Sequence, residues 1–275
     1  MNTLKLKPEG WNNEITKLDI KDINKYIEND EILQGLVKKC DGEYNLYIDL
    51  GNGITGIIPR EEVEGINIEE NGLPKVNLCI GKVHKFVQFK VKEEKEDKVV
   101  ILSRKEVQKE TLNWVKNDLK KGQKVTGIVK NIRPYGAFIE IAGGVVGLAH
   151  IEDLSIARIK TPYERLKIGQ KVDVMVKSID KDNGKVILSY KEMLGTWEEN
   201  VEKFVTGTNT KGIVRETEKN KNGIFIELTP NLVGMAEYEE GLSYGQEVEV
   251  YIKKIDKEKK KVKLLIVQDK VYNSK

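Results

Sequence analysis

Short apolar segments separated by glycine and polar turns recur three times along the chain. In each copy, a segment of alternating apolar and polar residues leads to a glycine that stands twelve residues after the segment's first residue. The segments are residues 44–50, 135–141 and 222–228, and the glycines are Gly56, Gly147 and Gly234. Recurrence with constant spacing is typical of structural repeats. The pattern therefore predicts three copies of one unit.

Further landmarks keep the same order in every copy. A Gly-aliphatic-Val step precedes the segment, at residues 35–37, 127–129 and 212–214. A second glycine follows it, at Gly81, Gly169 and Gly245, and a β-rich run closes the copy at residues 99–103, 185–189 and 261–265. About five short, evenly spaced strands per unit are typical of a small barrel. We therefore expect an all-β chain of three tandem five-stranded antiparallel barrels.

Amphipathic stretches between the units predict short helices. Three stripes have helical spacing: Leu194, Trp197, Val201 and Phe204; Leu112, Val115 and Leu119; and Ile20, Ile23 and Ile27. The expected domains are an N-terminal helical extension at 1–30, a first barrel at 31–104, a linker helix at 105–120, a second barrel at 121–190, a linker helix at 191–204, a third barrel at 205–268 and a tail at 269–275.

The alternation within each segment places an aromatic ring outside the expected core. Because successive side chains of a strand point to opposite faces, Phe138 and Glu140 point outward in the middle copy. The outward residues of the other copies are Tyr47 and Asp49, and Phe225 and Glu227. A base stacked on an exposed ring contributes about 1–3 kcal/mol. The recurrent ring therefore indicates binding of single-stranded nucleic acid, unless neighbouring units or linker helices cover it.

Composition argues against catalytic and metal-dependent classes. The 275 residues include only two histidines, His84 and His150, and two cysteines, Cys40 and Cys79, without a CxxC pair. The sequence offers almost no residues from which a His-based triad, a zinc site or a disulfide framework could be assembled. No apolar run approaches the roughly 18 residues of a membrane span, and the first nine residues lack the apolar core of a secretory signal. We expect a soluble cytoplasmic protein without cofactor or metal.

The net charge of +3 is too small to indicate nucleic acid by itself, but the charge is unevenly distributed. Residues 121–190 contain 12 Lys and Arg against 7 Asp and Glu, a net charge of +5. Residues 31–104 contain 11 against 13, a net charge of −2, and residues 205–268 contain 11 against 10, a net charge of +1. Because phosphates attract cations, the middle unit is the strongest candidate for binding nucleic acid.

Five short strings of the middle unit are characteristic of a known family. They are Gly127-Ile128-Val129, Tyr135-Gly136-Ala137-Phe138-Ile139, Gly147-Leu148-Ala149-His150-Ile151, Ile168-Gly169-Gln170-Lys171-Val172 and Ile187-Leu188-Ser189. In these strings the unit resembles the RNA-binding repeat of bacterial small-subunit ribosomal protein one, the S-one family, whose fold is an oligonucleotide/oligosaccharide-binding (OB) barrel. The resemblance spans residues 31–268 and implies three OB-fold barrels joined by short α-helices.

The resemblance also implies which residues of the middle unit face RNA: two aromatics, a histidine, an acid and a base. The matching positions hold Tyr135, Phe138, His150, Asp180 and Lys185. Lysine at position 185, where the family usually has arginine, keeps the phosphate charge but loses planar stacking. Lys130 and Arg133 are two further basic candidates for RNA contacts.

The outer units keep fewer of these residues. The first unit keeps both rings, Tyr44 and Tyr47. It has Pro59 at the histidine position and Val99 at the basic position. The third unit keeps Phe225, Asp256 and Lys261 but has Asn222 in place of the first ring and Glu237 in place of the histidine. We therefore expect the middle unit to bind RNA most tightly, and the outer units to be weaker candidates of similar strength.

These features predict a non-enzymatic protein that binds single-stranded RNA. By resemblance, it holds messenger RNA at the small ribosomal subunit during translation or acts as an RNA chaperone, as a monomer and without a membrane. Two other classes remain open. Repeats of this kind also occur as accessory modules of ribonucleases and phosphorylases, although no catalytic core remains outside the three units. The same repeats could also form a protein-binding scaffold or a regulator of transcription or RNA decay.

Overall fold

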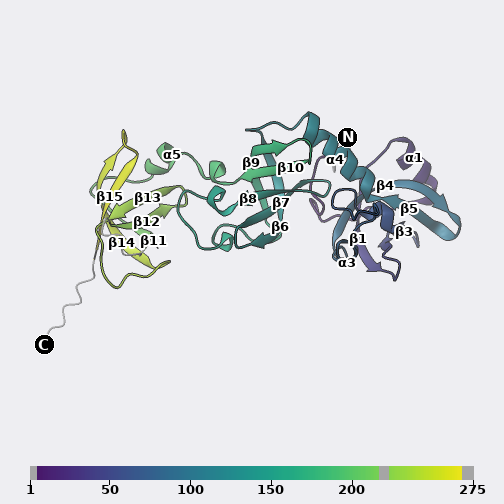
Figure 1. The fold of residues 1–275 in the computed structure, drawn as a ribbon, viewed down its shortest axis with the longest axis horizontal. Helices are drawn as coiled ribbons and strands as arrows, with labels where there is room; N and C mark the ends of the chain where they lie inside the picture. Colours follow the sequence, from purple (N-terminus) through teal and green to yellow (C-terminus); the bar gives the residue numbers. More distant parts are fainter. Residues whose placement is uncertain (1–4, 217–222, 268–275) are drawn as a thin grey trace. The chain divides into compact units, whose positions relative to one another are not determined.

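The structure, a computed structural model, describes residues 5–216 and 223–267 and contains three closed five-stranded barrels (Figure 1), which confirms the predicted fold class. The first barrel consists of β1 (Leu33–Cys40), β2 (Leu46–Asp49), β3 (Thr55–Ile58), β4 (Phe86–Lys95) and β5 (Val99–Ser103). The middle barrel consists of β6 (Lys124–Arg133), β7 (Gly136–Ala142), β8 (Val145–His150), β9 (Lys171–Asp180) and β10 (Lys185–Ser189). The third consists of β11 (Asn209–Glu216), β12 (Ile224–Thr229), β13 (Leu232–Ala236), β14 (Glu247–Asp256) and β15 (Lys261–Ile266).

The three barrels share one circular strand order. The orders are β1-β2-β3-β5-β4, β10-β8-β7-β6-β9 and β11-β12-β13-β15-β14, which are the same circle read in one direction or the other. The strand pairs that close the first and third barrels, β3 with β5 and β13 with β15, are parallel, and the other pairs of these barrels are antiparallel. The parallel pair follows from the strand order. In the first barrel β1, β3 and β5 run in one direction and β2 and β4 in the other, and the order makes β3 and β5 neighbours.

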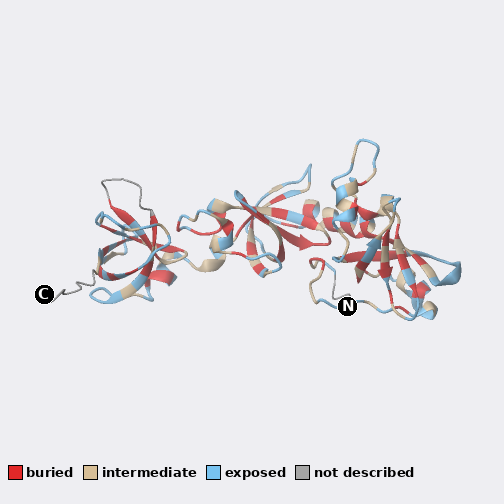
Figure 2. Ribbon diagram, turned by 90° about the horizontal axis from the view of Figure 1, so that it is seen from below, coloured by how far each residue is buried: buried red, intermediate tan, exposed pale blue. Residues whose placement is uncertain are grey.

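Alternating burial along the strands produces the cores. Figure 2 shows buried residues along the strands of each barrel and exposed residues in the turns. On β2, Leu46 and Ile48 are buried while Tyr47 is half-buried and Asp49 is exposed. One glycine in the first strand of each barrel permits close packing: a Cβ on Gly35, Gly127 or Gly212 would lie 2.5 Å from the Cγ2 of an isoleucine in the second strand. The recurrent Gly-aliphatic-Val step is therefore a packing requirement of the barrel.

The helices agree in part with the predicted stretches. They are α1 (Ile23–Glu28), α2 (Arg60–Val63), α3 (Val76–Ile80), α4 (Arg104–Asn117) and α5 (Trp197–Val201), with 3-10 turns at Ile20–Asp22, Glu96–Lys98, Ile151–Asp153, Pro162–Glu164 and Lys191–Leu194. The apolar stripe from Leu194 to Phe204 does not form one helix, because Gly195 adopts a φ of +81° and separates the two parts. Thr196 then begins α5 with a capping box to Glu199.

The N-terminal residues are part of the first barrel's packing. Leu18 and Ile23 are fully buried in the same apolar cluster as Ile48 and Phe89. The backbone N–H of Leu18 donates a hydrogen bond of 2.8 Å to the carbonyl of Leu50. The segment expected to be a helical extension therefore contributes directly to a barrel core.

The chain divides into two compact units, and the division passes through the middle barrel. One unit comprises residues 1–131, 138–148 and 168–187, and the other comprises residues 132–137, 149–167 and 188–275. The N-terminal residues and the first barrel belong to the first unit, and the third barrel belongs to the second.

Candidate nucleic-acid interface

The ring of Tyr135 stands in the turn that joins β6 to β7 and is 51% exposed. The carbonyl oxygen of Tyr135 accepts a hydrogen bond of 2.9 Å from the N–H of Ile151. This bond fixes the turn next to His150, the last residue of β8. Two residues that the sequence predicts as RNA contacts are thereby held close together by the backbone.

Phe138 lies on β7 between two buried neighbours, Ala137 and Ile139, and its own side chain is only partly buried. The strand order places β7 beside β8 and β8 beside β10. The strands that carry Phe138, His150 and Lys185 are therefore successive in the sheet. Phe138 is less buried than both of its neighbours, which fits the predicted alternation.

His150 caps the 3-10 helix Ile151–Asp153. Its Nδ1 accepts a hydrogen bond of 3.4 Å from the N–H of Glu152 and lies 3.7 Å from the carboxylate of the same residue. With Nδ1 accepting, the neutral imidazole carries its proton on Nε2. The exposed imidazole can therefore donate from Nε2 to a base or a phosphate.

Asp180 has a structural task in the turn between β9 and β10. Its carboxylate accepts hydrogen bonds from the backbone N–H and the side-chain amide of Asn183, at 3.1 and 2.8 Å. The bond from the Asn183 side chain is the largest of the effects that lower the pKa of Asp180. Lys185 begins β10 after this turn and is exposed. Asp180 thus shapes the turn that presents Lys185.

The two additional basic candidates differ in their surroundings. Arg133 ends β6 and is exposed. Lys130 lies 2.9 Å from the carboxylate of Glu140 and donates a hydrogen bond of 2.7 Å to the carbonyl of Glu9. Because Glu140 is only 2% exposed, moving Lys130 to a phosphate would take the cation of an ion pair away from a buried carboxylate. Lys130 therefore packs against Glu140 and the N-terminal segment in this structure, and a contact of Lys130 with RNA stays a prediction.

The alternation predicts that Glu140 and Glu227 lie on an exposed polar face. In the structure they are only 2% and 5% exposed. Each accepts bonds from a basic side chain on its own barrel and from a group outside it. Glu140 is held by Lys130 and by the N–H of Glu9 at 2.7 Å. Glu227 is held by Arg215 at 2.5 Å and by Arg165 at 2.6 Å. Both carboxylates are buried because distant chain segments cover them.

A buried ionic network surrounds Glu9 and was not predicted. The carboxylate of Glu9 lies 2.6 Å from Nε of Arg104, and Nη1 of Arg104 lies 2.9 Å from the carboxylate of Glu64. Burial alone would raise the pKa of Glu9, but Arg104 and Lys82 lower it to about 2. Glu9 therefore remains ionised at neutral pH and ties the N-terminal segment to α4.

The rings of the first barrel are held by cations of the same barrel. The Nζ of Lys39 lies 4.3 Å from the centre of the Tyr47 ring, and the guanidinium of Arg60 lies 5.2 Å from the centre of the Tyr44 ring. The Tyr47 hydroxyl donates a hydrogen bond of 3.0 Å to Asp41. An incoming base would have to compete with these contacts for a ring face.

The third barrel presents a different face. Phe225 is 40% exposed on β12, and Lys261 is exposed at the start of β15. Asp256 accepts a hydrogen bond of 3.0 Å from the N–H of Lys259, which repeats the turn made by Asp180. Asn222 lies outside the described residues. Glu237, at the position of His150, is exposed.

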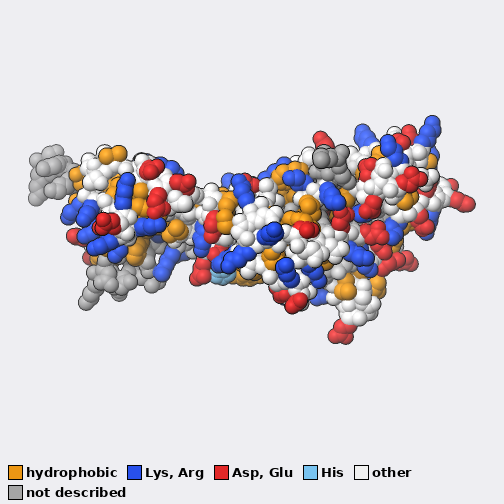
Figure 3. Space-filling model, turned by 90° about the horizontal axis from the view of Figure 1, so that it is seen from above, with side chains coloured by type: hydrophobic (Ala, Val, Ile, Leu, Met, Phe, Trp, Pro, Cys, Tyr) orange, Lys and Arg blue, Asp and Glu red, His pale blue; other side chains and the backbone are white. Residues whose placement is uncertain are grey.

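The electrostatic surface is mixed. Figure 3 shows lysine and arginine side chains intermingled with acidic ones over the visible face. Among the described residues, the structure contains no group of three or more His, Cys, Asp or Glu side chains that could hold a metal ion. No helix within the described ranges is both long and apolar enough to cross a membrane.

Comparisons with known proteins identify a family model and several similar proteins. The family model described as "S1 RNA binding domain" matches residues 118–191. The chain is 33% identical over 258 residues to small ribosomal subunit protein bS1 of Staphylococcus aureus, which covers 87% of this chain and 62% of that protein. It is 28% identical over 236 residues to bS1 of Chlamydia muridarum, covering 81% of this chain and 40% of that protein. The solution structure of GSP13 from Bacillus subtilis aligns at 32% identity and a TM-score of 0.27, over 28% of this chain and 58% of that one.

The chain spans less than two thirds of the length of these ribosomal relatives. All five strands of the middle barrel lie within the residues matched by the family model. The match to the "S1 RNA binding domain" model therefore falls on the middle barrel, and the resemblance of the chain to the bacterial S-one family is confirmed.

Proposed function

We propose that this chain binds single-stranded RNA without catalysis, chiefly through the outer face of the middle barrel. The observation that carries the proposal is the half-exposed Tyr135, whose backbone carbonyl is tied to the residue after His150 by the Ile151 hydrogen bond within the matched domain. Tyr135 and Phe138 provide surfaces for unstacked bases, and Arg133 and Lys185 attract the phosphates. A barrel of this kind suits single-stranded regions and loops better than duplex RNA.

The two ribosomal relatives extend the proposal. Both are small ribosomal subunit proteins, and we propose that this chain holds messenger RNA at that subunit in the cytoplasm as a monomer. Co-sedimentation with small subunits, with and without added messenger RNA, tests this role. Pelleting that requires the subunits supports the role, and a chain that remains in the supernatant under both conditions contradicts it.

Phe138→Ala tests the RNA-binding face directly. Losing one stacking ring should weaken binding to a uridine oligonucleotide by about 1–3 kcal/mol, measured by fluorescence anisotropy on the full chain. Tyr163→Ala is the matched control, because Tyr163 is a 56% exposed aromatic of the same repeat that lies on the 3-10 helix Pro162–Glu164. Equal affinities for both variants and the parent chain would remove Phe138 from the interface.

A further inference from the structure

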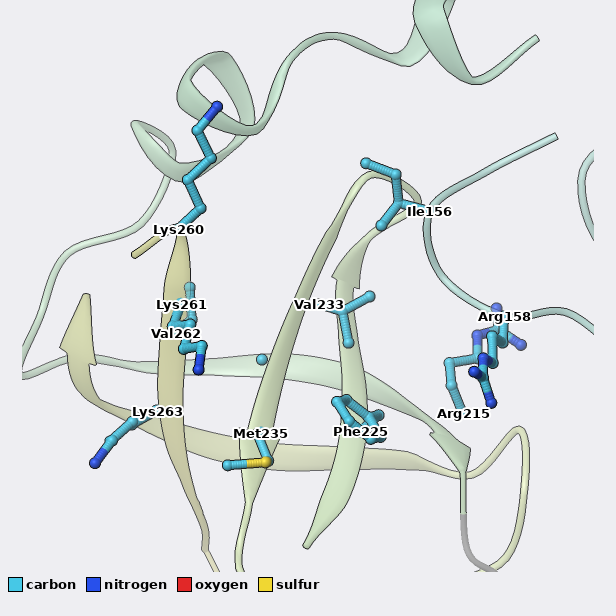
Figure 4. Close-up of a pocket in the computed structure, with 11 residues that line it drawn as sticks. Ile156, Arg158, Arg215, Phe225, Val233, Met235, Lys260, Lys261, Val262 and Lys263 are labelled. Atoms are coloured by element: carbon cyan, nitrogen blue, oxygen red, sulfur yellow. The ribbon is translucent and has the colours of Figure 1, made fainter. Parts of the chain in front are cut away.

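Two hollows of the molecule differ in their chemistry. The first is a groove on the third barrel, where Figure 4 shows Phe225, Val233 and Met235 with Arg158 and Arg215 on one side. This groove belongs to the predicted RNA-binding face of that barrel. The second lies in the compact unit that contains the first barrel, and it contains none of the aromatic residues predicted to bind RNA.

The second hollow, which we call the His84 pocket, has a volume of about 420 Å³. Pockets for small ligands typically have volumes of about 300–1,000 Å³. The lining comes from the N-terminal segment, the turn between α3 and β4, the start of α4, and strands β6, β7 and β8. All of these residues belong to one compact unit. The size therefore suits a small molecule.

His84 occupies a turn position that is glycine in the other two repeats. The N–H groups of His84, Gly169 and Gly245 donate hydrogen bonds of 2.9, 2.7 and 2.8 Å to the valine carbonyl of the Gly-aliphatic-Val step. The φ values of these residues are +60°, +84° and +82°. Glycine adopts such values freely, whereas other side chains are strained there, and retained strain often marks a functional site. Gly81, the glycine that the sequence landmarks place here, lies three residues earlier.

The lining of the pocket carries more positive than negative side chains. Its cations are Lys82, Lys85, Arg104 and Lys130, and its acids are Glu9 and Glu140. Arg104 and Lys130 form ion pairs with these acids. His84 and Lys85 are exposed, and neither forms an ion pair with another described residue. Their side chains are therefore available to an anionic ligand.

Lys82 adds a third group that favours an anion. Its Nζ lies 3.7 Å from the carboxylate of Glu9, which Arg104 already holds at 2.6 Å. Burial, followed by the charge of Arg104, lowers the pKa of Lys82. A negative charge in the pocket would counteract both effects, because it stabilises the ammonium form.

Apolar side chains stand beside these cations. Val146 of β8 is 42% exposed, and Ile168, which precedes β9, is 55% exposed. The half-buried ring of Phe86 also lines the pocket. An apolar wall with a few convergent polar groups is the usual composition of a small-ligand site. The ligand that fits it has an anionic group and an apolar body.

We infer that the His84 pocket binds a small phosphomonoester that carries a ring, the chemistry of a nucleoside monophosphate. A phosphomonoester has nearly two negative charges and three acceptor oxygens, which match the imidazole of His84 and the ammonium groups of Lys82 and Lys85. The ring lies against Val146 and Ile168. The inference goes beyond RNA binding and does not depend on it.

Calorimetric titration of the full chain with uridine 5′-monophosphate tests the pocket. Uridine lacks the phosphate and should bind at least about 10-fold more weakly, because hydrogen bonds to a charged group are lost. Inorganic phosphate lacks the ring and should also bind more weakly than the nucleotide.

His84→Gly and Lys85→Ala should each weaken nucleotide binding about 10- to 100-fold, because each removes a donor to the charged phosphate. Lys38→Ala is the control, since Lys38 is an exposed lysine of β1 that does not line the pocket. His84→Gly should melt at or above the temperature of the parent chain, because glycine relieves the strained turn. A loss of binding in this variant then reflects the missing imidazole.

The same variants are titrated with oligouridylate, which separates the pocket from the RNA-binding face. Both should bind oligouridylate like the parent chain. Phe138→Ala should keep its affinity for the nucleotide and lose affinity for oligouridylate. A parent chain that binds the nucleotide and not oligouridylate would contradict the proposed function and leave the pocket standing.

Three results would overturn the inference. The first is nucleotide binding by His84→Gly and Lys85→Ala that equals that of the parent chain. The second is equal affinity for uridine and its monophosphate, which would show that the cations do not hold the ligand. The third is loss of nucleotide binding in Phe138→Ala with His84→Gly unaffected, which would assign the nucleotide to the RNA-binding face.

Discussion

Tyr47 of the first barrel and Phe225 of the third occupy the same register of the second strand, but their surroundings differ. The Tyr47 hydroxyl is bound to Asp41, and Lys39 lies over its ring. Phe225 has no hydroxyl, is 40% exposed and forms the floor of a groove with Met235. Sequence alignment alone gave these two barrels similar weight as RNA binders. The contacts of each ring favour the third.

The acid two residues further along the strand shows a second contrast. Asp49 is exposed, and the hydrogen bond given to its carboxylate comes from the N–H of Gly51 nearby. Glu227 is buried between Arg215 and Arg165, and Arg165 belongs to the preceding repeat. In the first barrel, the acid at this position is exposed and accepts a hydrogen bond within a turn. In the third barrel, the acid at the same position forms a buried ion pair with the preceding repeat. What a repeat position does depends on which segment covers it.

The largest expected effect on stability concerns the buried ion pairs of Glu227. Glu227→Gln removes the negative charge between two buried guanidinium groups and should lower the free energy of unfolding by about 3 kcal/mol. Asp49→Asn should change it by less than about 0.5 kcal/mol, because the position is exposed and an amide oxygen can still accept from Gly51. Urea unfolding of both variants measures the difference. Equal values would show that the buried and exposed acids are energetically equivalent.

The two rings should differ next in RNA binding. Tyr47→Ala should leave the affinity of the full chain for a long oligouridylate within about twofold, whereas Phe225→Ala should weaken it by about 1–3 kcal/mol. The reason is that a base on Tyr47 has to displace Lys39, whereas Phe225 faces an open groove. Anisotropy titrations of the two variants at one salt concentration make the comparison. A larger loss for Tyr47→Ala would reverse the order of the barrels.

The smallest effect is a change in tyrosine titration. The hydrogen bond to Asp41 raises the pKa of Tyr47 above that of a free phenol. A raised pKa means that the bond stabilises the folded chain fully below the ordinary pKa of a phenol, and that this contribution is lost as the pH rises through the raised value. In Asp41→Asn one tyrosine should titrate at lower pH, visible as an ultraviolet difference against the parent chain. Superimposable titration curves would show that Asp41 does not hold the hydroxyl.

The repeat landmarks were sufficient to predict the barrels. The glycine at position 35, 127 or 212 and the alternation that follows it are local features, and each reports the packing of one barrel. The ring of Phe138 could be placed outside the core for the same reason, whereas Tyr135 was identified through the resemblance to the S-one family. Both remain at least partly exposed in the structure.

Contacts between distant segments could not be predicted in this way. Glu140 is covered by Glu9, which is 131 residues away in the sequence, and alternation within a strand carries no information about such a partner. A signal did exist in the repeats. Lys130 and Arg215 both stand three residues after the recurrent glycine, and each pairs with the outward acid of its own barrel. In the middle and third repeats, the recurrence of this base together with the outward acid was the signal for the ion pair.

Photo-crosslinking tests the central claim most directly. Oligouridylate of about 24 nucleotides, long enough for more than one OB barrel, carries 4-thiouridine and is irradiated in complex with the full chain. The crosslinked peptides are then identified by mass spectrometry. We expect the most crosslinks at Tyr135 and Phe138, fewer at Phe225 and Met235, and the fewest at Tyr44 and Tyr47. Crosslinks concentrated on Tyr44 and Tyr47, with the middle barrel unmodified, would contradict it.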